Sequence, residues 1–282
     1  MTLIEDYFRV RSMTPDDLKL ALSWAASEGW NPGIDDVDNF YSADPGGFLI
    51  GELNGQPISC ISVVRYHSNF NFIGLYIVKP EYRKQGYGLK TWQEAFKLIP
   101  GQNAALDAVL EQVKTYQKFG FKPFHSHLRY QGIISGTMAN DLVDLKTINF
   151  AQLCNYDRQY FPGDRPNFLS HWINQPHGQG YGILNGENLV GYGVIRKATD
   201  GYKIAPLFAE NEEIAEKLFL ALACYAQGDS IYIDVPNINN PGISLVERYQ
   251  MQSMFECVRM YTGEQPNINW TNIFGVTSLE LG

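Results

Sequence analysis

Two glycines and an arginine follow an apolar segment of the chain, and residues of these types can bind a phosphate. The apolar segment covers residues 72–78, Arg83, Gly86 and Gly88 follow it, and a helical pattern covers residues 89–96. A strand that turns sharply into a helix leaves backbone N–H groups unpaired, and the helix dipole adds to their attraction for an anion. Glycine lets the main chain approach a phosphate with no Cβ in the way. The turn is therefore suited to a pyrophosphate.

The turn needs a strand before it and a helix after it, and the first half of the chain alternates in the same way. Thr14 and the proline and acids after it are helix start signals. Asn54 and Gly55 predict a tight turn between two strands. The expected strands are 8–11, 48–53, 58–64, 72–78, 104–109 and 124–130, and the expected helices are 14–28, 35–41, 89–96 and 112–119.

The second half repeats this plan. An offset of 131 residues places 51–55 on 182–186, and it also places Val63 on Val194 and Arg65 on Arg196. Six of the fifteen residues in this ungapped window are identical. Two unrelated hairpins can share Asn-Gly by chance, but the ungapped continuation favours duplication. We expect two domains, 1–136 and 137–282.

Composition excludes several classes of protein. The chain has 282 residues, long enough for two domains, and its formal net charge of −8 argues against a nucleic-acid-binding protein. No segment approaches the length of about 20 apolar residues that a membrane span needs, and residues 1–7 lack the features of a signal peptide. There is no Cys-x-x-Cys motif and no histidine pair with zinc spacing. We therefore expect a cytoplasmic protein with no structural metal.

Two motifs together indicate a family. Val78-x-Pro80 leads into Arg83-x-x-Gly86-x-Gly88, and Tyr-Gln-Lys-Phe-Gly-Phe follows at residues 116–121. This order resembles the GNAT N-acetyltransferase superfamily over residues 7–135. The second half looks like the divergent GNAT-type domain of a two-domain subfamily. The segment 30–33 of the first half also resembles the sequences of that subfamily. The resemblance implies an α/β fold of two tandem domains, each with a mixed, mostly antiparallel sheet flanked by helices.

The resemblance also implies acetyl-coenzyme A as cofactor. Its pyrophosphate would lie on the amides of the turn, with two basic side chains nearby, and its pantetheine arm would run along the preceding strand like an added strand. The residues expected to contact the cofactor are Tyr76, Ile77, Val78, Arg83, Lys84, Gln85, Gly86, Tyr87, Gly88 and Leu89.

Amide formation sets the remaining chemistry. The attacking amine must be neutral, although an alkylammonium has a pKa of about 10.4. The leaving thiolate needs a proton, and Tyr116 matches the family position for that general acid; the alternative is a helix tyrosine that only packs on the core. The implied acceptor is a small amine or amino acid, with Trp30 and Asn31 bordering its site. A non-catalytic module that binds acyl-coenzyme A is the second hypothesis.

The general base is not evident. Many members of the family carry a glutamate where this chain has Gly74, which favours the non-catalytic alternative. Glu28, at the end of the first helix, is the candidate we name as catalytic; the alternative is an exposed helix residue. The other candidates are Asp36, His67 and a water chain to a backbone carbonyl. His125 and His127 share a strand face, where they either border the pocket or face solvent.

The second half is expected to have lost the chemistry. Glu210, Glu212 and Glu213 stand where the first half has its glycine turn, and an offset of 130 replaces Tyr116 by Val246. Carboxylates there would repel a pyrophosphate. The polar segments 179–182, 157–165 and 234–240 could wall the acceptor pocket, with Arg158 or Arg165 taking a substrate carboxylate; the alternative is surface turns and interdomain salt bridges.

Overall fold

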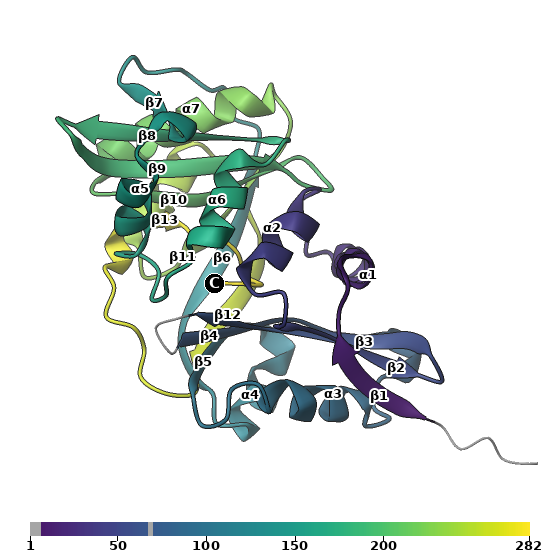
Figure 1. The fold of residues 1–282 in the computed structure, drawn as a ribbon. Coiled ribbons are helices and arrows are strands. Elements are labelled where there is room, and N and C mark those ends of the chain that lie inside the picture. Colours follow the sequence, from purple (N-terminus) through teal and green to yellow (C-terminus); the bar gives the residue numbers. More distant parts are fainter. Residues whose placement is uncertain (1–6, 67–69) are drawn as a thin grey trace, which may run out of the picture.

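A computed structural model describes residues 7–66 and 70–282 of the chain (Figure 1). His67, and the residues 1–6 on which the signal-peptide expectation falls, lie outside this range. No helix in the described part is long and apolar enough to cross a membrane.

The first half confirms the predicted alternation of strands and helices. Thr14 caps the first helix, since its side chain accepts a hydrogen bond from the backbone N–H of Asp17. Asn54 and Gly55 both have positive φ and close the predicted hairpin. The elements are β1 (Phe8–Ser12), α1 (Pro15–Ser27), α2 (Asp36–Ala43), β2 (Phe48–Leu53), β3 (Gln56–Tyr66), β4 (Phe70–Val78), η1 (Pro80–Tyr82), α3 (Tyr87–Phe96), β5 (Asn103–Val109), η2 (Leu110–Gln112), α4 (Val113–Lys118) and β6 (Lys122–Gly132).

The second half follows the same order with an extra strand near its end. Its elements are β7 (Leu142–Asp144), η3 (Leu145–Thr147), α5 (Phe150–Asp157), α6 (Pro166–Asn174), β8 (Gly178–Asn185), β9 (Asn188–Lys197), β10 (Tyr202–Ala209), α7 (Glu212–Ala226), β11 (Ile231–Pro236), α8 (Asn240–Arg248), β12 (Gln252–Tyr261), η4 (Trp270–Asn272) and β13 (Ile273–Gly275). Residues 179–182, one of the polar segments expected to wall the acceptor pocket or form a surface turn, are part of β8 because they pair with β9.

The two halves exchange their last long strands. The strand order is β1-β2-β3-β4-β5-β12-β6-β11-β10-β9-β8-β7, so β12 lies beside β5 of the first half and β6 lies beside β11 of the second. Residues 124–130 were expected to close the first half; they form a strand, but it completes the sheet of the second. The boundary predicted between residues 136 and 137 stays a prediction, since strands from each side of it complete the other half.

One mixed sheet results, and it is mostly antiparallel as predicted. Among the described strands, only β4 with β5 and β10 with β11 pair in parallel. Helix α3 packs on one face of the first half, where Trp92 belongs to the same apolar core as Ile61 and Val63 of β3. On the other face, Phe40 of α2 and Trp172 of α6 belong to one core that both halves build. The long strands β6 and β12 connect the halves, and Gly282 lies in the middle of the molecule (Figure 1).

Candidate active site

A cavity of about 540 Å³ opens where β4 and β5 diverge. The parallel pairing of these strands ends at Ile73 and Leu106, so residues 74–78 continue with no strand partner on that side among the described strands. Strand β12 borders the space, as do the start of α3, the end of α1 and α4. Eleven of the residues that the sequence analysis assigned to the site line this cavity: Glu28, Trp30, Tyr76, Ile77, Val78, Arg83, Lys84, Gly86, Gly88, Leu89 and Tyr116.

The glycine turn lies at one end of the cavity. Gly86 has a φ of +87° and stands at the N-cap of α3, where no side chain caps the helix. A Cβ on Gly86 would meet no protein atom within 4 Å, so the turn is open on that side. A Cβ on Gly88 would lie 2.8 Å from the Tyr76 hydroxyl, so this position has no room for a side chain. The turn thus presents uncapped helix N–H groups toward open space.

Two predicted residues of the turn do not line the cavity. Gln85 donates a hydrogen bond to the carbonyl of Glu81 at 2.8 Å, and the Tyr87 ring packs on Phe8 at a centroid distance of 5.1 Å. Both contacts hold the turn in shape.

Arg83 and Glu28 form an ion pair at the rim of the cavity. The Arg83 guanidinium donates to the Glu28 carboxylate and, through Nε, to the carbonyl of Val78 at 2.8 Å. Arg83, which was expected to bind an anion, and Glu28, the candidate general base, are therefore paired with each other.

Tyr116 is fixed by aromatic packing. Its ring lies 5.5 Å from that of Trp92 and 6.2 Å from that of Phe121, centroid to centroid. Burial raises the pKa of the Tyr116 phenol well above its ordinary value. Burial also raises the pKa of Tyr76, the other phenol of this cavity, to about 12. Tyr116 is accordingly protonated at neutral pH and can donate.

The other end of the cavity is built by both halves. The carbonyl of Trp30 accepts a hydrogen bond from Arg129 at 2.9 Å and another from Lys203 at 3.0 Å. Arg129 also makes a two-pronged ion pair with Asp234, at 2.7 and 2.9 Å. Asn31 does not line the cavity, because its amide exchanges two hydrogen bonds with the backbone of Asp200.

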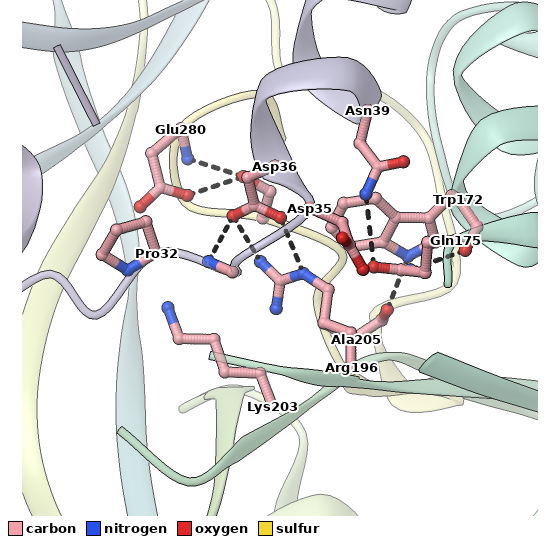
Figure 2. Close-up of polar contacts among 12 residues, drawn as sticks. Pro32, Asp35, Asp36, Asn39, Trp172, Gln175, Arg196, Lys203, Ala205 and Glu280 are labelled. Carbon is pink, nitrogen blue, oxygen red and sulfur yellow. Dashed lines mark hydrogen bonds and ion pairs between the residues drawn. The ribbon is translucent and has the colours of Figure 1, made fainter. Parts of the chain in front are cut away.

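Asp36 lies outside the cavity. It is 1% exposed, accepts two hydrogen bonds from Arg196 at 3.1 Å each, and accepts a third from the backbone N–H of Gly33 at 2.6 Å (Figure 2). This buried pair joins α2 to β9, so it links the two halves.

The histidine pair of β6 also lies inside the protein. His125 and His127 share one strand face as expected, but they are 5% and 0% exposed, so neither faces solvent, and neither lines the cavity. Their Nε2 atoms lie 2.9 Å apart, and His127 Nδ1 lies 3.1 Å from Asp107. Burial, reinforced by His127, lowers the pKa of His125 to about 2.

Asp107, His127 and Cys257 hold possible metal-ligating atoms within 4.8 Å of one another. Both Asp107 oxygens, however, accept hydrogen bonds from Arg259, at 2.9 and 2.8 Å. Burial opposes ionisation of Asp107, but Arg259 and then His127 hold its pKa well below the usual range. Burial raises the pKa of Cys257, which keeps its thiol protonated. A guanidinium beside a neutral thiol disfavours binding of a metal cation. We therefore interpret these three residues as a structural link between β5, β6 and β12.

The two arginines proposed for a substrate carboxylate have other partners. Arg158 pairs with Asp164 at the surface. Arg165 is buried, where it binds Asp157 at 2.7 and 2.8 Å and the Thr277 hydroxyl at 2.9 Å. For this loop the structure favours the salt-bridge alternative.

Four residues that the sequence analysis did not single out enter the cavity from the end of the chain: Phe255, Cys257, Leu279 and Glu280. The last two belong to the segment 276–282, which we call the closing segment. A Cβ on Gly74 would overlap the carbonyl oxygen of Glu280, so the closing segment lies directly against β4. Gly74 was the available signal, because a glycine inside a strand marks the close approach of another backbone.

The corresponding slot of the second half is filled. Strand β13 pairs with β10 at Leu207 and Phe208, beyond the parallel pairing of β10 with β11, which ends at Ile204. The backbone N–H of Val276 then donates to the backbone carbonyl of Asp234 in β11 at 2.9 Å. At the start of α7, the side chain of Asn211 accepts from the N–H of Ile214, so this helix is capped by its own chain.

Comparison with family models supports the duplication. The model of the acetyltransferase (GNAT) family matches residues 16–121, and a model of an acetyltransferase (GNAT) domain matches residues 153–275. The holothin acyltransferase of Pseudoalteromonas sp. (strain SANK 73390) is 30% identical over 270 residues, which cover 95% of this chain and 92% of that protein.

Solved structures share the tandem fold. A candidate acetyltransferase from Pyrococcus horikoshii superposes with a TM-score of 0.84 at 22% identity, covering 98% of this chain and 96% of the other. A tandem GNAT protein from the clavulanic acid biosynthesis pathway gives a TM-score of 0.62 at 12% identity, over 92% and 100% of the two chains. At these identities the likeness concerns the fold alone.

Proposed function

Because the chain belongs to the GNAT acyltransferase family, with a GNAT domain in each half, we propose that it transfers an acetyl group from acetyl-coenzyme A to the amine of a small molecule. The observation that carries the proposal is that the glycine turn, the unpaired end of β4 and Tyr116 border one cavity. The name of a relative, the holothin acyltransferase, supports acyl transfer.

The residues of the turn fit such a donor. The open face at Gly86 leaves room for a pyrophosphate at the uncapped start of α3, and Arg83 and Lys84 border the same space. Within the described part of the chain, the backbone of Tyr76, Ile77 and Val78 has no strand partner on the cavity side, so it can pair with an extended pantetheine arm. When bound, the coenzyme ester supplies the acyl carbon that the amine attacks.

Tyr116 is proposed as the general acid. Its raised pKa keeps the proton on the phenol at neutral pH, so Tyr116 is in the protonated form that can donate to the sulfur as the thiolate departs. Trp92 and Phe121 hold the Tyr116 ring in place. Its hydroxyl has no hydrogen-bond partner among the described residues. The backbone N–H groups near Leu75 remain candidates for donors to the oxyanion.

Thiol release from acetyl-coenzyme A in the presence of a panel of small amines tests the proposal. We expect turnover, and we expect Tyr116→Phe to lower kcat by about 10²-fold, because the ring still packs but the proton is gone. Affinity for the coenzyme should change little.

Tyr76→Phe is the matched control, since it removes the other phenol of the cavity, and we expect a smaller loss. Full turnover by Tyr116→Phe, with acyl transfer shown to be rate-limiting, would remove the role of Tyr116. Tight binding of the coenzyme without turnover on any amine would indicate a binding module instead.

A further inference from the structure

Three carboxylates line the cavity, and two of them are already engaged. Glu28 is held by Arg83, and both oxygens of Asp107 accept hydrogen bonds from Arg259. Glu280 is the third, and no histidine lines the cavity among the described residues. A base for an incoming amine therefore has to be sought first at Glu280.

The Glu280 carboxylate is oriented by a hydrogen bond but forms no ion pair among the described residues. It is 8% exposed, and its Oε2 accepts a hydrogen bond from the Ser278 hydroxyl at 2.7 Å (Figure 2). Among the described residues, no group donates a hydrogen bond to Oε1. The Ser278 hydroxyl in turn accepts from the backbone N–H of Glu280 at 3.0 Å, which fixes the turn that presents the carboxylate.

The closing segment that carries Glu280 is firmly anchored. The Tyr66 hydroxyl donates to the carbonyl of Leu281 at 2.8 Å, and Arg165 donates to the Thr277 hydroxyl at 2.9 Å. The main chain of Glu280 lies against Gly74, where any larger residue would displace it. The carboxylate is thus held over the point where β4 leaves β5.

Two basic residues that interact with Glu280 direct their hydrogen bonds elsewhere. Arg129 and Lys203 both interact electrostatically with Glu280. Arg129, however, directs its hydrogen bonds to Asp234 and to the carbonyl of Trp30, and Lys203 donates to that same carbonyl. Oε1 of Glu280 therefore remains available to a ligand.

We propose that Glu280 binds the ammonium group of an alkylamine acceptor and takes its proton; this inference rests on the acyl-transfer function proposed above. The ammonium gives one proton to Oε1 and becomes a neutral amine. The amine nitrogen forms the C–N bond to the acyl carbon, and the C–S bond breaks. Tyr116 gives its proton to the thiolate and recovers one from the nitrogen, while Glu280 releases its proton to solvent through the cavity.

The inference gives a role to the second half of the chain. The segment that runs on from β13 brings the missing acid–base group into the cavity of the first half. It also assigns an acceptor class, since a carboxylate with one free oxygen selects a protonated amine over a hydroxyl.

The test compares two acceptors in the intact chain. One is an alkylamine, which is protonated at pH 7, and the other is an arylamine, which is already neutral at that pH. With Glu280→Gln we expect kcat/KM for the alkylamine to fall by about 10²-fold at pH 7, and the arylamine to change much less. Raising the pH toward the pKa of the alkylammonium, where more of the amine is already neutral, should recover the alkylamine rate of Glu280→Gln.

Glu94→Gln, the same change at a half-buried position of α3 that does not line the cavity, is the control and should leave both rates unchanged. Ser278→Ala keeps the charge but removes the orienting hydrogen bond, so it should lower the alkylamine rate in the same direction by a smaller factor. It also preserves the test if Glu280→Gln folds poorly.

The outcomes separate the two proposals. An alkylamine rate untouched by Glu280→Gln, or equal losses for both amines, overturns the role of Glu280 and leaves acyl transfer standing. A wild-type chain that binds the coenzyme but acylates neither amine overturns both.

Discussion

At the scale of single residues, the boundary between the halves holds buried charges that pair across it. Asp36 meets Arg196, and Arg129 meets Asp234, each with two hydrogen bonds. Lys203 differs, because it donates a hydrogen bond to the Trp30 carbonyl and not to a carboxylate, and Arg129 donates to the same carbonyl. Burial, reinforced by Arg129, lowers the pKa of Lys203 to about 7.

This depressed pKa makes stability depend on pH in a known direction. Unfolded, Lys203 keeps its proton up to about pH 10.4, whereas the folded chain loses it near pH 7. Between these values the unfolded state binds more protons, so the contribution of Lys203 to stability rises with pH and is lost as pH falls toward 7.

We therefore expect Lys203→Met to raise the free energy of unfolding at pH 7 by about 1–3 kcal/mol. The Trp30 carbonyl keeps its bond from Arg129, so no acceptor is left unpaired. Urea unfolding of both proteins at pH 7 and pH 9.5 measures the difference, which should shrink at the higher pH. A destabilised variant at pH 7 would show that the lysine contributes net stability.

At the scale of elements, the two halves use the same divergence of parallel strands for different ends. In the first half, β4 leaves β5 after Ile73, and the space between them is the cavity. In the second half, β10 leaves β11 after Ile204, and β13 occupies the space. In the second half, β13 thus pairs with the backbone groups of β10 that correspond to those a pantetheine arm would pair with in the first half.

At the scale of the whole molecule, neither half is complete without the other. Strand β12 covers the edge of β5, and β6 covers the edge of β11. An uncovered strand edge of this kind favours aggregation. We expect residues 1–136 expressed alone to be insoluble or inactive, and we expect co-expression with 137–282 to restore folded, active protein.

Copurification of the two pieces and thiol-release activity of the pair provide the measurement. The intact chain is the control. A soluble and fully active 1–136 fragment would contradict the importance of the exchange and of Glu280 together.

The sequence predicted what local chemistry determines. Gly86 and Gly88 located the turn because a positive φ and a close approach need glycine, and Thr14 located a helix because it caps one. It could not predict that β12 lies between β5 and β6, since an apolar alternation marks a strand without naming its neighbour.

The acid–base group was missed for the same reason. Gly74 indicated that a carboxylate was absent from β4, but Glu280 lies about two hundred positions further along the chain, and only the tertiary fold brings it there. Asp36 was a reasonable candidate by type, but it is buried and paired with Arg196 outside the cavity.

The central claim is that one glycine turn, and only that of the first half, binds the coenzyme. Calorimetric titration of the intact chain with coenzyme A tests it, using Gly86→Ala and Gly55→Ala as a matched pair. Both glycines have positive φ, +87° and +79°, and open space around the missing Cβ, so both changes impose similar backbone strain of about 1–2 kcal/mol.

We predict one equivalent of coenzyme per chain, binding weakened about tenfold or more by Gly86→Ala and unchanged by Gly55→Ala. No binding, two equivalents, or equal effects of the two substitutions would contradict the account.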